Sequence, residues 1–146
     1  LGFFNTEKYR RGLVFGPRAK GDDIERFEWL NEAVTETLAL DMDKEKDIKS
    51  PSYSEERLLL SMLINGPVGK SEFKIDKKKF THAYFENYEA KEAEEIRLQH
   101  WKELMRTIND SYYPGFLVKI DKIIKRRGIS YVRHHFSRLC ENKDSD

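Results

Sequence analysis

The spacing of apolar residues along the chain predicts helices over most of its length. Between 22 and about 40, apolar residues recur every three or four positions and so mark one helical face: Ile24, Phe27, Leu30, Val34 and Leu38. Acidic residues crowd the start of this segment, where the helix dipole favours them, so Asp22 or Asp23 is the expected N-cap. A charged loop, Asp41 to Ser50, follows and ends before Pro51.

The middle of the chain predicts two or three further helices. Ser54 starts one, and Gly66 and Pro67 end it. Its expected buried face holds Leu58, Leu59, Met62 and Leu63. The next apolar stripe holds Phe80, Ala83, Tyr84 and Tyr88. A following stripe holds Ile96, Leu98, Trp101, Leu104, Met105 and Ile108. No helix breaker stands between Glu86 and Glu95, so these two stripes form either one helix or two.

The C-terminal part predicts two helices separated by Gly128. Pro114 suits the first position of a helix, which carries Phe116, Leu117, Ile120, Ile123 and Ile124 on its apolar face. The last helix presents Ile129, Val132, Phe136, Leu139 and Cys140. No alternating apolar and polar run indicates a strand. The expected fold class is therefore all-α, an antiparallel helical bundle.

Composition and the positions of glycine and proline residues divide the chain into three parts. Residues 1–21 are rich in glycine and predict an irregular N-terminal arm with a short helix or two, residues 22–140 a single helical domain, and residues 141–146 a polar tail. The chain opens with Leu1 instead of Met, so we expect a piece of a longer protein. A single cysteine, Cys140, excludes an internal disulfide, and no run approaches the roughly 20 apolar residues of a membrane span. We therefore expect a cytoplasmic protein.

The net charge of +1 conceals two poles of opposite sign. Between Asp22 and Asp47, ten acidic residues stand against three basic ones. Between Lys119 and Arg138 the balance reverses, with seven basic residues against Asp121. The candidate basic surface comprises Lys119, Lys122, Lys125, Arg126, Arg127 and Arg133. Such poles either steer partners or face each other and solvent.

Motifs for catalysis or for metal and phosphate binding fail on spacing. Gly69-Lys70-Ser71 lacks the earlier glycine of a phosphate-binding loop, because that position is Ile64. The alternating acids from Asp41 to Asp47 lack the glycine and the final glutamate of a calcium loop. The four histidines include no i,i+4 pair, and with one cysteine a zinc site is not expected. A helix-turn-helix around Gly128 would bury polar positions. We expect no enzyme activity, no metal and no cofactor.

Three stretches in order are similar to the regulator-of-G-protein-signalling (RGS) homology family. Glu25–Leu30 resembles the family's Glu-Asn-Leu-Glu-Phe-Trp opening of a central helix. The stretch from Glu56 through Phe73-Lys74-Ile75-Asp76 resembles the next helix and its Asn-Ile-Asp turn. The last stretch, Trp101 to Leu117, ends in Tyr-Pro-Gly-Phe-Leu and resembles the family's Tyr-Pro-Arg-Phe-Leu. The resemblance covers 22 to about 127. It implies the RGS fold with an extra C-terminal helix, and the first 21 residues do not match.

The resemblance also implies a partner-binding set. GTPase-activating members press three loops against a Gα subunit, and their contact residues correspond here to Arg26, Lys74, Ser111 and Gly115. The family has Asn at the first two positions and Asp and Arg at the last two. The resemblance therefore extends to the helices but not to these contact residues. Lysine cannot accept a hydrogen bond as asparagine does, and glycine offers no guanidinium. The pattern is similar to scaffold members of the axin and sorting-nexin types, with the Tyr-Pro-small-Phe-Leu form closer to axin's.

The sequence therefore predicts a non-catalytic protein–protein interaction domain, a scaffold or adaptor module of a larger signalling or trafficking protein. Its expected partner is a protein segment of a signalling scaffold. Two alternatives stay open. One is a genuine GTPase activator that acts on a Gα subunit. The other is binding of an anionic nucleic acid or phosphoinositide through the basic C-terminal helices, although these cations lack the regular aromatic interleaving that nucleic-acid binding would favour.

Overall fold

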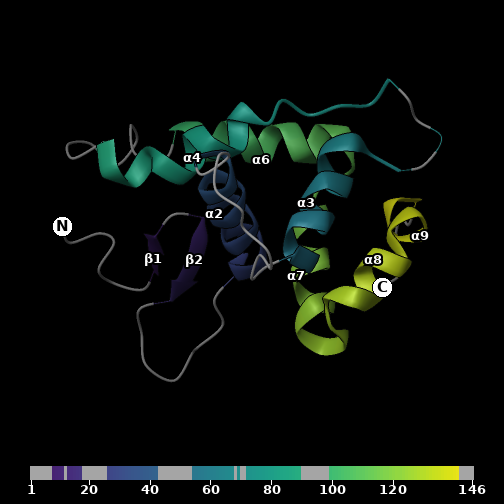
Figure 1. Ribbon diagram of the computed structural model, residues 1–146. Coiled ribbons are helices and arrows are strands. Elements are labelled where there is room, and N and C mark those ends of the chain that lie inside the picture. The colour runs from purple at the N-terminus through teal and green to yellow at the C-terminus, as the bar shows by residue number, and fades with distance from the viewer. Residues whose placement is uncertain are drawn as a thin grey trace.

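The computed structural model describes residues 8–11, 13–17, 26–42, 54–67, 69, 72–89 and 99–141. Within these ranges two short strands precede seven helices (Figure 1). The elements in chain order are β1 Lys8–Arg11, β2 Val14–Pro17, α2 Glu28–Met42, α3 Ser54–Asn65, α4 Lys78–Glu89, α6 Gln99–Ser111, α7 Phe116–Arg127, α8 Ile129–His134 and α9 Phe136–Glu141. The mainly helical class expected from the sequence is confirmed for the described residues from 26 onward.

The N-terminal arm differs from the expectation of one or two short helices. Its described part is an antiparallel hairpin in which Lys8 pairs with Pro17 and Arg11 with Val14. Each strand has four residues, too short for an alternating pattern to stand out. Leu13, between the strands, is fully buried, and its backbone N–H donates to Asn31 Oδ1 at 2.9 Å. The arm therefore contributes to the core.

The first long helix begins later than the sequence indicates. α2 starts at Glu28, and the proposed caps Asp22 and Asp23 lie outside the described residues. Phe27, just before α2, has a φ of 69°, which costs strain for a non-glycine residue. Its N–H donates to Oδ1 of the buried Asp121 at 3.0 Å, and its ring packs against Trp101 with centroids 5.6 Å apart. A long-range contact with α7 thus fixes where α2 begins.

The buried face of α3 is turned slightly from the expected one. Leu59 and Leu63 are buried as predicted, but Leu60 and Ile64 join them, and Leu58 is 48% exposed. The prediction that Leu58 belongs to the core is wrong. The apolar run Leu58-Leu59-Leu60 gives three adjacent positions that could begin the stripe. The i,i+4 pairs 59/63 and 60/64 are the ones that pack.

The two middle stripes form separate helices, α4 and α6, with Ile96 and Leu98 outside the described residues. The helices run antiparallel, because Lys79 Nζ meets Glu103 Oε2 at 2.8 Å while the His82 and His100 rings lie 5.2 Å apart. Glu86 of α4 is buried and accepts the backbone N–H groups of His100 and Trp101 in the first turn of α6. Glu86 therefore caps a helix other than its own.

The C-terminal helices keep their predicted faces but not all of their bounds. α7 begins at Phe116, preceded by Gly115 with a φ of 85°, so Pro114 lies in the turn and is not the first helical residue. Gly128 ends α7 as expected. The single last helix is instead two, α8 and α9, divided at His135. Val132, Phe136 and Leu139 are buried, so the apolar face is continuous across the division.

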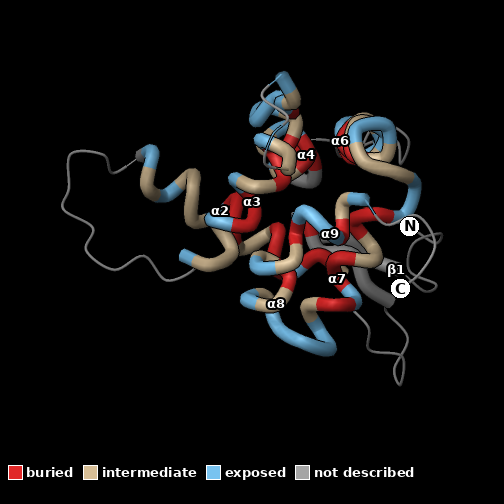
Figure 2. Tube along the Cα trace, turned by 90° about the vertical axis from the view of Figure 1, so that its right-hand side faces the viewer, coloured by how far each residue is buried: buried red, intermediate tan, exposed pale blue. Residues whose placement is uncertain are grey.

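All seven described helices contribute buried residues to the core, and Figure 2 shows these residues in red. Phe80 and Phe116 are the largest fully buried side chains. None of the helices described here is both long and apolar enough to cross a membrane. The described part of the predicted 22–140 domain shares one hydrophobic cluster, which also includes Leu13 from the arm.

Candidate functional site: a cationic groove on α3

A groove of about 790 Å³ is the largest of the described pockets and lies between α2, α3 and the residues that follow α3. Its apolar floor is Leu60 and Ile64, whose side chains are buried. Its polar lining comprises Thr37, Arg57, Ser61, Asn65, Lys74, Asp76 and Lys77. Pockets that bind ligands commonly enclose about 300–1,000 Å³ and combine an apolar surface with a few polar groups. The groove has both properties.

The turn that forms one wall of the groove is held firmly against α3. The N–H of Ile75 donates to the carbonyl of Ile64 at 2.9 Å, and the Ile75 side chain is buried. Gly66, with a φ of 82°, lets the chain leave α3, and a Cβ added there would lie 2.5 Å from Phe73. Only glycine allows this close approach. The wall is therefore built into the fold.

Tyr112 fastens the same wall to the end of α6. Its ring lies 5.1 Å from that of Phe73, and its hydroxyl donates to the carbonyl of Leu63 at 2.5 Å. Burial, and secondarily the nearby Cys140, raises the pKa of Tyr112 well above its ordinary value. The hydroxyl thus stays protonated and remains a donor at any pH near neutrality.

Charge in the groove is predominantly positive. Arg57, Lys74 and Lys77 stand against the single carboxylate of Asp76. Oδ1 of Asp76 accepts the N–H of Lys78 at 3.0 Å, so this acid helps to start α4. Nε of Arg57 is buried and has no hydrogen-bond partner among the described residues.

The structure brings together only part of the predicted partner-binding set. Lys74 lines the groove, and Ser111 and Gly115 flank the turn that carries Tyr112, next to the Lys74 wall. Arg26 precedes Phe27, which packs on Trp101 near the other end of α6. Trp101 and Ser111 are ten residues apart on that helix, about 15 Å along its axis. Arg26 is therefore separate from the other three.

The candidate basic surface is largely engaged by its own surroundings. Lys125 Nζ lies 3.5 Å from Asp121 Oδ2, and Arg133 Nη1 lies 3.6 Å from Glu55 Oε1. The Arg127 guanidinium stacks 4.3 Å from the centre of the Tyr131 ring, and Lys119 lies 5.9 Å from that of Tyr113. Lys122 and Arg126 are exposed.

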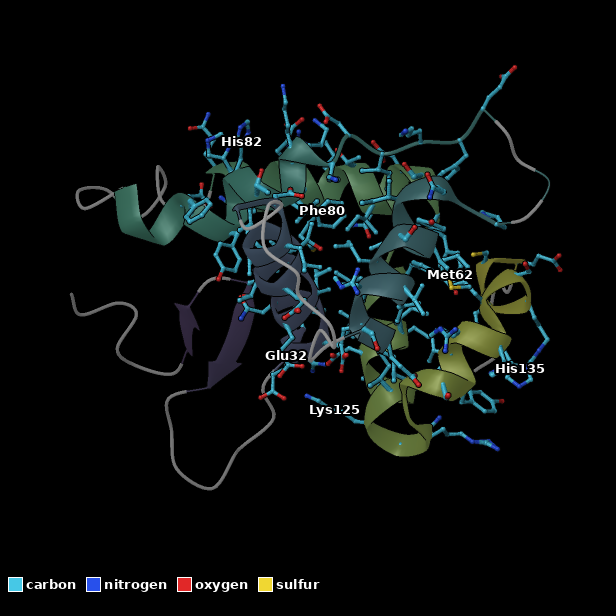
Figure 3. All side chains as sticks on the ribbon, in the orientation of Figure 1. Glu32, Met62, Phe80, His82, Lys125 and His135 are labelled. Carbon is cyan, nitrogen blue, oxygen red and sulfur yellow. The ribbon has the colours of Figure 1, made fainter. Side chains whose placement is uncertain are left out.

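The acidic and basic poles meet at a second pocket of about 200 Å³. Glu28 and Glu32 of α2 line it together with Glu56, Asp121 and Lys125. In Figure 3, Lys125 reaches from α7 toward the side of α2 that carries Glu32. Burial, with a smaller contribution from Glu56, raises the pKa of Glu32. The poles face each other here, as one reading of the charge pattern expected.

A third pocket, of about 280 Å³, lies between α4 and α6 and contains His82 and His100 with Lys79, Gln99 and Glu103. Sequence spacing could not find this histidine pair, because the two residues come from different helices. Across the described residues, no three His, Cys, Asp or Glu side chains gather so that they could hold a metal ion.

Sequence reasoning found Lys74 but missed Arg57 and Lys77 as groove residues. A usable signal exists for the α3 wall, because Arg57, Leu60 and Ile64 follow one another at helical spacing. The expected buried face, which included Leu58, is turned away from this stripe, so the sequence analysis does not predict it. Comparison with protein-family models, curated proteins and solved structures gives no match to this chain.

Proposed function

We propose that this chain is a non-catalytic interaction domain of a larger signalling or trafficking protein, with an RGS-like helical frame, and that it holds a segment of a protein partner in the groove on α3. The observation that carries the proposal is the groove itself. It has a buried aliphatic floor of Leu60 and Ile64 and a rim of long polar side chains. A peptide segment uses both, with apolar side chains on the floor and polar groups at the rim.

The firmness of the groove wall supports the same proposal. The Ile75–Ile64 backbone bond, the Gly66–Phe73 approach and the Tyr112–Phe73 ring contact all act on one turn. A surface that is formed before binding loses little conformational entropy when a partner arrives. This arrangement suits recognition without a large structural change.

The scaffold reading is favoured over the GTPase-activator reading by the placement of the predicted contacts. An activator must present its three loops to one Gα surface. Here Lys74 lies beside the turn that carries Ser111 and Gly115, whereas Arg26 lies toward the other end of α6. Arg26 and Lys74 also bring positive charge to positions where the family has neutral amides. We therefore propose that the domain does not accelerate GTP hydrolysis.

Site-specific photo-crosslinking tests the interaction proposal. A photoreactive residue at the exposed groove position Ser61 should capture a defined partner from cell lysate, and the purified partner should then bind the domain directly. The same residue at Lys102, exposed on α6, is the matched control. Equal capture at both positions, or no direct binding after purification, would contradict the proposal.

The activator alternative has its own test, single-turnover GTP hydrolysis by a panel of Gα subunits at high domain concentration. We expect no acceleration. A tenfold or greater acceleration that disappears in Lys74→Ala would replace the scaffold proposal with the activator one.

A further inference from the structure

The groove on α3 carries an unbalanced charge at a site that the fold keeps fixed. Three of its lining residues are cations and one is an acid, and that acid also caps α4 through the N–H of Lys78. Lys74 and Lys77 are exposed and form no ion pair within the part of the chain that the structure describes. The positive charge of the groove is therefore directed to what enters from solvent.

Arg57 provides the second observation. Its Nε is buried beside the groove and lacks a hydrogen-bond partner among the described residues, although buried polar groups are nearly always paired. A guanidinium presents its N–H donors in a planar fork that matches a carboxylate with two parallel bonds. A carboxylate in the groove would meet the terminal N–H groups of this guanidinium through such a fork.

The arrangement of the cations around the apolar floor limits which kinds of ligand the groove could bind. Arg57 lies on α3, and Lys74 and Lys77 lie on the turn that follows, so the charges come from two elements. Leu60 and Ile64 form the floor of the same groove. An occupant that satisfies all of these groups needs several negative charges and at least one aliphatic side chain.

We propose that the groove binds an acidic segment of a partner protein, in which Asp or Glu carboxylates meet Arg57, Lys74 and Lys77 while an aliphatic side chain covers Leu60 and Ile64. This inference rests on the proposed function and names the chemistry of its partner. On the basic surface of α7 and α8, Lys125 and Arg133 face Asp121 and Glu55, whereas Lys122 and Arg126 are exposed and therefore serve as the control in the test.

The test uses a fluorescein-labelled peptide of 12 residues built from Asp, Glu, Leu and Ile. Its affinity is measured by fluorescence anisotropy at physiological salt. Three comparison peptides replace the acids by Asn and Gln, the aliphatic residues by Ser, or the acids by phosphoserine. The protein variants are Lys74→Gln/Lys77→Gln and, as the matched control, Lys122→Gln/Arg126→Gln, which removes the same charge from the exposed basic surface.

We expect the acidic peptide to bind at micromolar concentration and to shift the amide resonances of Leu60 and Ile64 but not that of Tyr131. The amide and the serine peptides should bind at least tenfold more weakly. The groove double variant should lose at least tenfold in affinity and the control less than twofold. Circular dichroism and urea unfolding will show that both variants remain folded.

Several results would overturn the inference. These are equal binding of the amide peptide, equal losses in the two double variants, tighter binding of the phosphoserine peptide, or no binding of the acidic peptide up to 1 mM. Failure of the proposed function is separate, because it appears as absent capture at Ser61. A partner captured at Ser61 through a segment without acidic residues would keep the proposed function and refute only the acidic chemistry.

Discussion

The chain has two cationic regions, the groove on α3 and the basic surface on α7 and α8, and they differ in what their charges contact. In the basic surface, Lys125 and Arg133 face Asp121 and Glu55. In the groove, Lys74 and Lys77 are exposed and form no ion pair with another described residue. The sequence shows seven basic residues between 119 and 138 and five lysines between 70 and 79, two of which line the groove. The comparison teaches that cations close together in sequence are not necessarily those available to a ligand.

The largest expected effect follows from removing the buried acid of the basic surface. Asp121→Ala should lower the free energy of unfolding by about 3–5 kcal/mol, because it leaves the strained Phe27 N–H and the Lys125 ammonium without their partner. Urea unfolding measures the loss. Asp121→Asn keeps an acceptor for Phe27 and should cost less. Equal losses in the two variants would show that the Phe27 contact has no structural weight.

A smaller effect is expected at the groove wall. Gly66→Ala should lower the free energy of unfolding by about 2–4 kcal/mol, because its Cβ would lie 2.5 Å from Phe73 at a φ of 82°. Gly115→Ala is the control, since its left-handed φ of 85° is similarly unfavourable but nothing lies within 4 Å of the added Cβ. We expect it to cost about 1–2 kcal/mol. If the two variants were equally unstable, Phe73 would not constrain the turn.

The two regions should also respond with opposite sign when a cation becomes methionine. Arg57→Met removes an unpaired buried donor and should raise the free energy of unfolding by about 1 kcal/mol. Lys125→Met removes a partner of the buried Asp121 and should lower it by about 1 kcal/mol. Urea midpoints compared under identical conditions test both. A destabilised Arg57→Met protein would mean that Arg57 serves the fold and not a ligand.

The smallest expected effect concerns the pocket where the two poles meet. Burial raises the pKa of Glu32 above 4.5, so ionised Glu32 opposes folding, and stability falls as the pH rises from 4.5 through the folded-state pKa. Glu32→Gln should therefore stabilise the protein at pH 7 by a few tenths of a kcal/mol, because this side chain is largely solvated. The gain should vanish at pH 3.5, where both proteins carry a neutral group. Thermal melts of Glu32→Gln and of Glu36→Gln at the two pH values provide the comparison.

Helical periodicity predicts a buried face wherever the apolar residues allow only one. The differences between the predicted and the observed helices arise from contacts between residues that are far apart in sequence. Within the described residues, the stripes on α4, α6 and α7 match the buried or half-buried residues because each has a single possible face. The start of α2 does not follow from its own residues, since Asp121 comes from 94 positions away. Three consecutive leucines leave the buried face of α3 undetermined by spacing alone. The position of Arg57 beside the groove therefore cannot be predicted from the sequence. Lys74 was found only through a resemblance, which remains a proposal.

Glu86 makes the start of one helix depend on the position of another. The start of α6 is set by a carboxylate that arrives from α4 and accepts the first free N–H groups of the helix. The N-terminus of α6 is therefore tied to the position of α4, and any change that displaces Glu86 also leaves the first N–H groups of α6 without their acceptor.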